Sequence, residues 1–135
     1  MALLNWKPEY SVNIREIDDQ HKKLVDMINE LHEAMVQQKA KEVLGSVLSK
    51  LVSYVATHFA NEERLMQSNG YPDFAAHKEK HEKMTAKVLA LQKEWQAGKA
   101  ALGIEVSQFL RDWLDKHILG TDQKYAPFLN SKGVK

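Results

Sequence analysis

Residues 77–95, HKEKHEKMTAKVLALQKEW, carry the pattern that decides the fold. Apolar or histidine side chains recur there at alternating intervals of four and three residues: His77, His81, Met84, Val88, Leu91 and Trp95. Positions at this spacing lie on one face of an α-helix. The stretch therefore predicts an amphipathic helix with two histidines on its inward face.

Three further segments show the same spacing, and polar or glycine-containing breaks separate them. The predicted helices cover 18–38, 41–67, 73–97 and 103–120, with breaks at QQKAK (37–41), SNGYPD (68–73) and QAGKAALG (96–103). We expect Asp18 and Asp19 to cap the first helix. Because short connections make consecutive helices antiparallel, the sequence predicts an all-α, up-down-up-down four-helix bundle.

The length of 135 residues suits a single domain with its own hydrophobic core. We expect this domain to span 1–135, with an N-terminal arm (1–17), the bundle (18–120) and a tail (121–135). The arm contains Trp6 and Tyr10 and is predicted to pack across the bundle in an extended or irregular form. The last residues, LNSKGVK (129–135), are predicted to fray.

Composition excludes several classes of function. The 19 Lys and Arg residues are interspersed with 18 Asp and Glu residues, so there is no basic stripe of the kind that binds nucleic acid. Cysteine is absent, which excludes disulfides and thiolate metal sites. The start of the chain lacks the apolar run of a signal peptide, and no stretch of about 18 consecutive apolar residues occurs. We expect a soluble, cytoplasmic, monomeric protein with no membrane span.

Ionisable residues interrupt the inward faces at one end of the predicted bundle. Helices rise about 1.5 Å per residue, so counting from the connections places the following residues in one layer: His21, His58, Glu62, His77, His81 and His117. An unpaired carboxylate buried in such a layer costs several kcal/mol, whereas a cation reverses that cost. His32 lies about 16 Å along the axis from His21, which is too far to join the layer.

This layer holds more candidate ligands than one metal ion can use. Structural zinc takes four ligands, and the HExxH motif of zinc proteases is absent because Lys78 follows His77. The Glu-x-x-His repeats of ferritin-like proteins are absent as well. Imidazole combined with carboxylate suits iron. The residues therefore favour two iron ions that share a bridging carboxylate.

Four fragments, in this order, resemble the hemerythrin family, and in particular its single-domain bacterial members, the bacteriohemerythrins. The fragments are IDDQHKKL (17–24), HFANEE (58–63), HKEKH (77–81) and HILGTD (117–122). The resemblance implies a non-haem di-iron centre that binds O2 reversibly. It implies that one iron is held by His77, His81 and His117, the other by His21 and His58, and that Glu62, Asp122 and an oxo or hydroxo group bridge both.

Asp122 belongs to this set only through the resemblance. A residue five positions after His117 lies about 140° away from it around an α-helix. Gly120 suggests that the helix loosens there as a π-type turn or a break.

The resemblance also implies a dry pocket over the open coordination position of the iron that has two histidines. Its walls would be Phe59, Trp113, Leu114 and Ile118, residues that could equally be ordinary core. Tyr125 is a candidate for the outer shell of the site or for a packing role. Glu63 is expected to face outward into solvent.

The leading functional hypothesis is a binding protein for O2 carriage, storage or delivery, with an O2-consuming protein as its partner, and not an enzyme. The alternatives are a di-iron peroxidase or a scavenger of nitric oxide or peroxide at the same centre. A third possibility is an O2 or redox sensor that acts through a separate partner protein.

Overall fold

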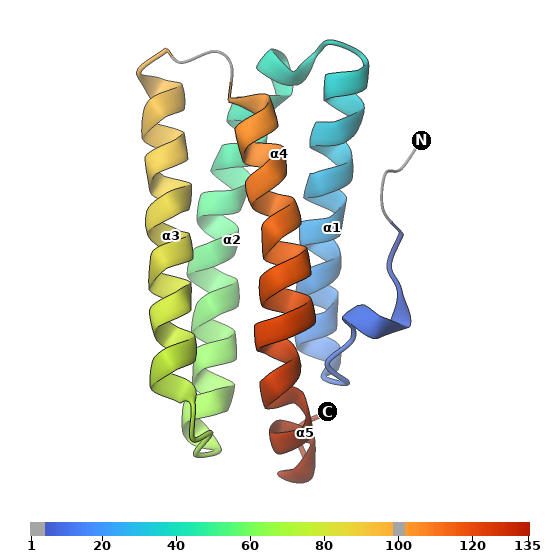
Figure 1. Cartoon of the computed structure of the whole chain (residues 1–135), viewed down its shortest axis with the longest axis vertical. Coiled ribbons are helices and arrows are strands. Elements are labelled where there is room, and N and C mark those ends of the chain that lie inside the picture. Colours follow the sequence, from blue (N-terminus) through green and yellow to red (C-terminus); the bar gives the residue numbers. More distant parts are fainter. Residues whose placement is uncertain (1–4, 99–101) are drawn as a thin grey trace.

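A computed structural model, which describes residues 5–98 and 102–135, shows an antiparallel four-helix bundle (Figure 1). The bundle consists of α1 (Arg15–Val36), α2 (Ala40–Ser68), α3 (Phe74–Gln96) and α4 (Gly103–Asp112). The fourth helix continues as a π-helix, η2 (Trp113–Asp122), and then as α5 (Gln123–Ser131). No β-strand occurs in the described residues. The predicted all-α, up-down-up-down fold is confirmed.

Two predicted boundaries differ from the structure. The first helix begins at Arg15 and not at residue 18, so Asp18 lies inside it and does not cap it. Its carboxylate accepts hydrogen bonds from Ser11 Oγ at 2.5 Å and from the backbone N–H of Val12 at 2.9 Å, and so ties the arm to the first turn. The chain also remains helical beyond residue 120, as far as Ser131. Residues 99–101 of the predicted connection 96–103 lie outside the described residues.

The break predicted at 68–73 is the turn that reverses the chain between α2 and α3. Gly70 adopts a positive φ of 72°, which glycine tolerates without steric cost. The N–H of Tyr71 donates to the carbonyl of Met66 at 2.9 Å, and the N–H of Gly70 donates to that of Gln67 at 3.2 Å. These bonds satisfy carbonyls at the end of α2. The turn is tight, so the end of α2 and the start of α3 lie side by side.

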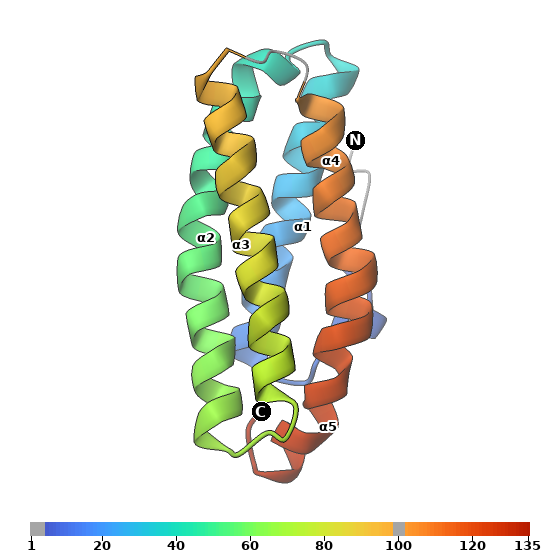
Figure 2. The same cartoon turned by 60° about the vertical axis from the view of Figure 1, so that its left-hand side comes forward.

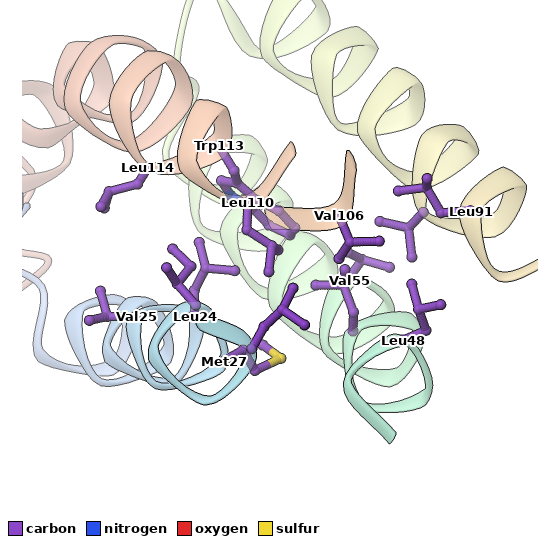
Figure 3. Close-up of a cluster of buried hydrophobic side chains, with 14 of the residues drawn as sticks. Leu24, Val25, Met27, Leu48, Val55, Leu91, Val106, Leu110, Trp113 and Leu114 are labelled. Carbon is purple, nitrogen blue, oxygen red and sulfur yellow. The ribbon is translucent and has the colours of Figure 1, made fainter. Parts of the chain in front are cut away.

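Buried apolar side chains from all four helices fill the middle of the bundle and are here called the main core (Figure 3). Leu24 of α1, Leu48 of α2, Leu91 of α3 and Leu110 of α4 are fully buried there. Burying a side chain of this size contributes about 1.5–3 kcal/mol. Met84 and Trp95, which were predicted to face inward, are half-buried and pack against this core, as do Met35 and Phe109.

One helix meets the length and composition requirements of a membrane span, although no span was expected. The segment Glu42–Ser68 of α2 has a mean hydropathy of 1.3 in its most apolar window, and 39% of that window is buried. A core helix of a bundle meets the same requirements. Since α2 packs against both α1 and α3, its apolar composition is accounted for by the core.

A second apolar cluster, here called the end cluster, closes the bundle where α2 passes into α3. It comprises Val12, Ile14, Ile17, Met66, Tyr71, Tyr125, Ala126 and Leu129. Figures 1 and 2 both show α5 at this end of the bundle. Leu129 is 1% exposed, so the fraying predicted from residue 129 onward is wrong at its first residue. The end cluster and the main core enclose the layer of ionisable residues between them.

Candidate metal centre

Five histidines and two carboxylates converge in the layer between the main core and the end cluster. They are His21 from α1, His58 and Glu62 from α2, His77 and His81 from α3, and His117 and Asp122 from η2. None of the seven residues is more than 5% exposed. The structure therefore brings together all seven residues that the sequence and the family resemblance indicate as ligands.

The carboxylate of Asp122 lies between two groups of histidines. Its Oδ1 is 3.1 Å from Nε2 of both His77 and His117. Its Oδ2 is 3.2 Å from Nε2 of His21. One oxygen therefore faces the three-histidine group (His77, His81 and His117), and the other faces the two-histidine group (His21 and His58).

Glu62 also contacts both groups. Its Oε1 lies 3.0 Å from Nε2 of His58 and 3.5 Å from Nε2 of His81. Its Oε2 lies 4.0 Å from Nε2 of His21 and accepts a hydrogen bond from the hydroxyl of Tyr125. Two carboxylates, each in reach of both histidine groups, have the arrangement that two bridged cations require.

The π-helix η2 brings Asp122 to the same face as His117. An α-helix would separate residues five apart by about 140°, whereas the wider π-helical turn pairs residue i with residue i+5. The expected loosening near Gly120 is confirmed as a π-helix, and it extends over the ten residues Trp113–Asp122. π-Helical turns occur frequently at functional sites.

Many of the buried polar atoms in this layer have no hydrogen-bond partner among the described residues. They include Nε2 of all five histidines, Oε1 of Glu62 and both carboxylate oxygens of Asp122. Buried polar atoms are normally satisfied, and each unsatisfied one costs free energy. The candidate ligand atoms form two sets, and within each set all atoms lie within 4.8 Å of one another. The first set is Glu62, His77, His81, His117 and Asp122, and the second is His21, His58 and Glu62. Cations bound between these atoms would remove the cost, so the residues fit a metal centre.

The electrostatics of the layer favour ionised carboxylates. Burial alone raises the pKa of Asp122, but the imidazoles of His117, His21 and His77 outweigh it and hold that pKa well below its usual range. Burial and Asp122 raise the pKa of Glu62, and the imidazoles of His58 and His81 lower it by more. Both carboxylates are therefore anionic, as metal ligands must be.

Two histidines are held from behind by hydrogen bonds that the sequence did not reveal. Nδ1 of His58 lies 2.5 Å from Oε1 of Gln20, and Nδ1 of His81 lies 3.0 Å from Oε2 of Glu63. The outward orientation expected for Glu63 is wrong, because its side chain is only 22% exposed and points to His81. Both acceptors directly adjoin a candidate ligand in the sequence, which is the signal that could have identified them.

Aromatic rings surround the histidines. Phe59 stacks on His81 with a centroid separation of 3.9 Å and an interplanar angle of 5°, and it lies 5.2 Å from Trp113. Tyr54 stacks on His58 with a centroid separation of 5.0 Å. This residue was not predicted to belong to the site, although it lies four positions before His58 in the sequence. The four residues expected to line an O2 pocket, Phe59, Trp113, Leu114 and Ile118, are all buried.

Tyr125 lies at the edge of the layer of candidate ligands, and His32 lies outside it. Tyr125 combines both roles considered for it, since it packs in the end cluster and donates its hydroxyl proton to Glu62. His32 is half-buried and belongs to neither set of candidate ligands.

Comparisons with known proteins agree with the geometry. Residues 12–129 match the model of the hemerythrin HHE cation binding domain. The chain is 42% identical over 132 residues to a bacteriohemerythrin of Methylococcus capsulatus, which covers 97% of this chain and 100% of that protein. It is 40% identical over 126 residues to a bacteriohemerythrin of Stenotrophomonas maltophilia, covering 93% of this chain and 81% of that protein.

The fold is equally similar to solved structures. A crystal structure of wild-type hemerythrin superposes with a TM-score of 0.84 at 41% sequence identity, over 95% of this chain and 98% of that one. A mutant of hemerythrin gives a TM-score of 0.85 at the same identity. Sequence, fold and the histidine–carboxylate layer lead to one conclusion: the chain belongs to the hemerythrin family.

Proposed function

We propose that this protein binds O2 reversibly at a non-haem di-iron centre and serves in O2 carriage, storage or delivery. The observation that carries the proposal is the division of five unsatisfied, buried imidazole nitrogens into a group of three and a group of two, with two carboxylates in reach of both. The bacteriohemerythrin relatives support the same function.

In the proposed centre, His77, His81 and His117 would hold one iron, His21 and His58 would hold the other, and Glu62, Asp122 and an oxo or hydroxo group would be shared by both. The side with two histidines would then have one ligand fewer than the side with three, and it is the side where O2 would bind. When bound, the iron pair would supply the electrons with which O2 is held. The residues themselves set the direction of the chemistry: five neutral imidazoles and two carboxylates donate less negative charge than a carboxylate-rich site, which favours reversible binding over oxygenation.

The apolar residues around the layer would keep water away from the open position. Phe59, Trp113, Leu114 and Ile118 are the proposed walls, and all four belong to the main core. Among the described residues the end cluster closes the opposite side of the layer. A dry site excludes water and so slows proton entry, which reversible O2 binding requires.

Stopped-flow measurement of O2 release from the iron-loaded protein tests carriage against catalysis. We expect the bound O2 to be recovered when the protein is mixed with an O2-consuming trap, over repeated cycles. Oxidation of the iron at every exposure to O2, without recoverable gas, would instead indicate a peroxidase or scavenging enzyme.

A further inference from the structure

The two hydrogen bonds behind the histidines differ in charge. His81, in the three-histidine group, is held by the carboxylate of Glu63, whereas His58, in the two-histidine group, is held by the amide oxygen of Gln20. His58 and His81 are both almost fully buried, and both bonds reach the ring nitrogen that faces away from Glu62. The same type of ligand therefore receives an anionic acceptor in one group and a neutral acceptor in the other.

Each bond fixes which ring nitrogen is free to bind a metal. A carboxylate oxygen and an amide oxygen can only accept here, so Nδ1 of each histidine carries the proton. In a neutral imidazole the other nitrogen, Nε2, then has the lone pair. Nε2 of His58 and of His81 both point toward Oε1 of Glu62, at 3.0 and 3.5 Å. Gln20 and Glu63 therefore present both ligands to the layer in the form that binds a cation.

The acceptor also sets how strongly the imidazole donates. A carboxylate draws the Nδ1 proton toward itself and raises the basicity of Nε2, and loss of such a partner typically lowers metal affinity by about 10–100-fold. A neutral amide gives a weaker hydrogen bond and less of this effect. Tyr54 also fixes the backbone at Gln20, because its hydroxyl donates to the carbonyl of that residue at 2.7 Å.

We propose that Glu63 and Gln20 are positioning residues that make the two metal subsites unequal, with the stronger-donating subsite on the side of His81. The inference rests on the ligand set of the proposed function. The subsite that contains His81 has three histidines and the additional negative charge of Glu63 behind it, so it binds a cation more tightly and favours the more highly charged state of that cation. The subsite that contains His58 remains the weaker donor, which suits the side proposed to bind O2.

Titration of the apoprotein with Co2+ measures this inequality without any O2 chemistry. Co2+ lies next to Fe2+ in affinity for nitrogen and oxygen ligands. Its visible absorption reports the filling of each subsite. We expect two steps for the unmodified protein, with the tighter step assigned to the three-histidine side.

Glu63→Gln keeps an oxygen that can accept from His81 and removes only the charge. We expect it to weaken the first step by about 10–100-fold and to leave the second unchanged. Gln20→Glu introduces the charge on the other side and should tighten the second step by a similar factor. The matched control is Glu82→Gln, which makes the same change at an exposed position directly after His81.

The outcomes separate this inference from the function on which it rests. Two steps that Glu63→Gln leaves unchanged, or weakens equally, would overturn the inference while leaving a dinuclear centre in place. An equal effect of Glu82→Gln would also overturn it, because any nearby charge would then suffice. Two ions bound in a single step would overturn the proposed inequality, whereas a ceiling of one Co2+ per chain would contradict the dinuclear centre itself. If Glu63→Gln does not fold, Gln20→Glu still decides the question, since only the proposed effect predicts a gain in affinity.

Discussion

Tyr125 and Glu62, which are 63 positions apart in the sequence, form a buried hydrogen bond in which the phenolic hydroxyl donates to Oε2 of the carboxylate. This bond connects the end cluster directly to a proposed bridging ligand. Oε1 of the same carboxylate remains without a hydrogen-bond partner among the described residues and faces His58 and His81. Tyr125 therefore fixes the orientation of Glu62, and Oε2 keeps a second lone pair that could bind a metal ion.

Replacing Tyr125 by phenylalanine removes the hydroxyl and preserves the ring, which lies 5.5 Å from that of His77. Because Oε2 of Glu62 then loses its donor in a buried site, we expect the free energy of unfolding of the apoprotein to fall by about 1–3 kcal/mol. Release of iron to a chelator should be faster. Urea denaturation and chelator kinetics are the measurements. Tyr71→Phe in the same cluster is the control, and equal effects of the two variants would assign Tyr125 to packing alone.

Iron content tests the ligand layer. Metal analysis of protein assembled with excess iron should approach two ions per chain, because the candidate ligands form two sets that share Glu62. Glu62→Ala should lower both iron content and thermal stability, since metal binding contributes directly to folding free energy. His32→Ala should retain the iron. A ceiling at one ion, or an equal loss of iron in the His32 variant, would be incompatible with the proposed centre.

Leu114 is expected to protect the site from water. It lies three residues before His117 and is almost fully buried in the main core. Leu114→Ser should cost about 2–5 kcal/mol in a packed core and should admit water beside the proposed open position. We expect faster autoxidation in air, measured by decay of the visible absorption of the O2-loaded protein, with little loss of iron.

Leu110→Ser provides the matched control for this variant. Leu110 is fully buried in the same cluster, one turn further from His117, and Figure 3 shows both side chains. Similar autoxidation rates in the two variants would indicate that general loosening of the core, and not the position of Leu114, admits water.

Gly120 is predicted to be replaceable. It is exposed within η2, and a Cβ atom added there would meet no atom within 4 Å. Because alanine loses less conformational entropy than glycine in a helix, Gly120→Ala should raise the free energy of unfolding by about 0.5–1 kcal/mol and leave iron content unchanged. Thermal denaturation and metal analysis measure both effects. Loss of iron would show that the π-helix depends on the flexibility of this glycine.

The bundle and most of its ligand layer follow from the sequence because helix geometry is regular. The spacing from His77 to Trp95 identifies one inward face, and the rise per residue places His21, His58 and His117 at the same level. Asp122 could not be placed in this way, since a π-helical segment breaks the periodicity on which the counting rests. Only the family resemblance indicated that residue.

The side chains of Asp18 and Glu63 differ from their predicted roles for physical reasons. Asp18 has the residue type of a helix cap, but its carboxylate instead binds Ser11 and the backbone of the arm, a contact that no local pattern reveals. Glu63 was expected to be solvated because it follows the inward-facing Glu62 by 100° around α2. The packing of α2 against α3 brings His81 to that side, so the orientation of Glu63 depends on tertiary contacts.

The π-helix η2 has a consequence for the part of the chain that follows it. If residues Trp113–Asp122 wound as an ordinary α-helix instead, with no residue removed, Asp122 would lie about 140° around the axis from His117. Every later residue would turn with Asp122. Tyr125 would leave Glu62, and Leu129 would leave the end cluster. The π-helix therefore sets the rotational phase of α5, so substitutions at its exposed positions should be accepted wherever they preserve the wider turn.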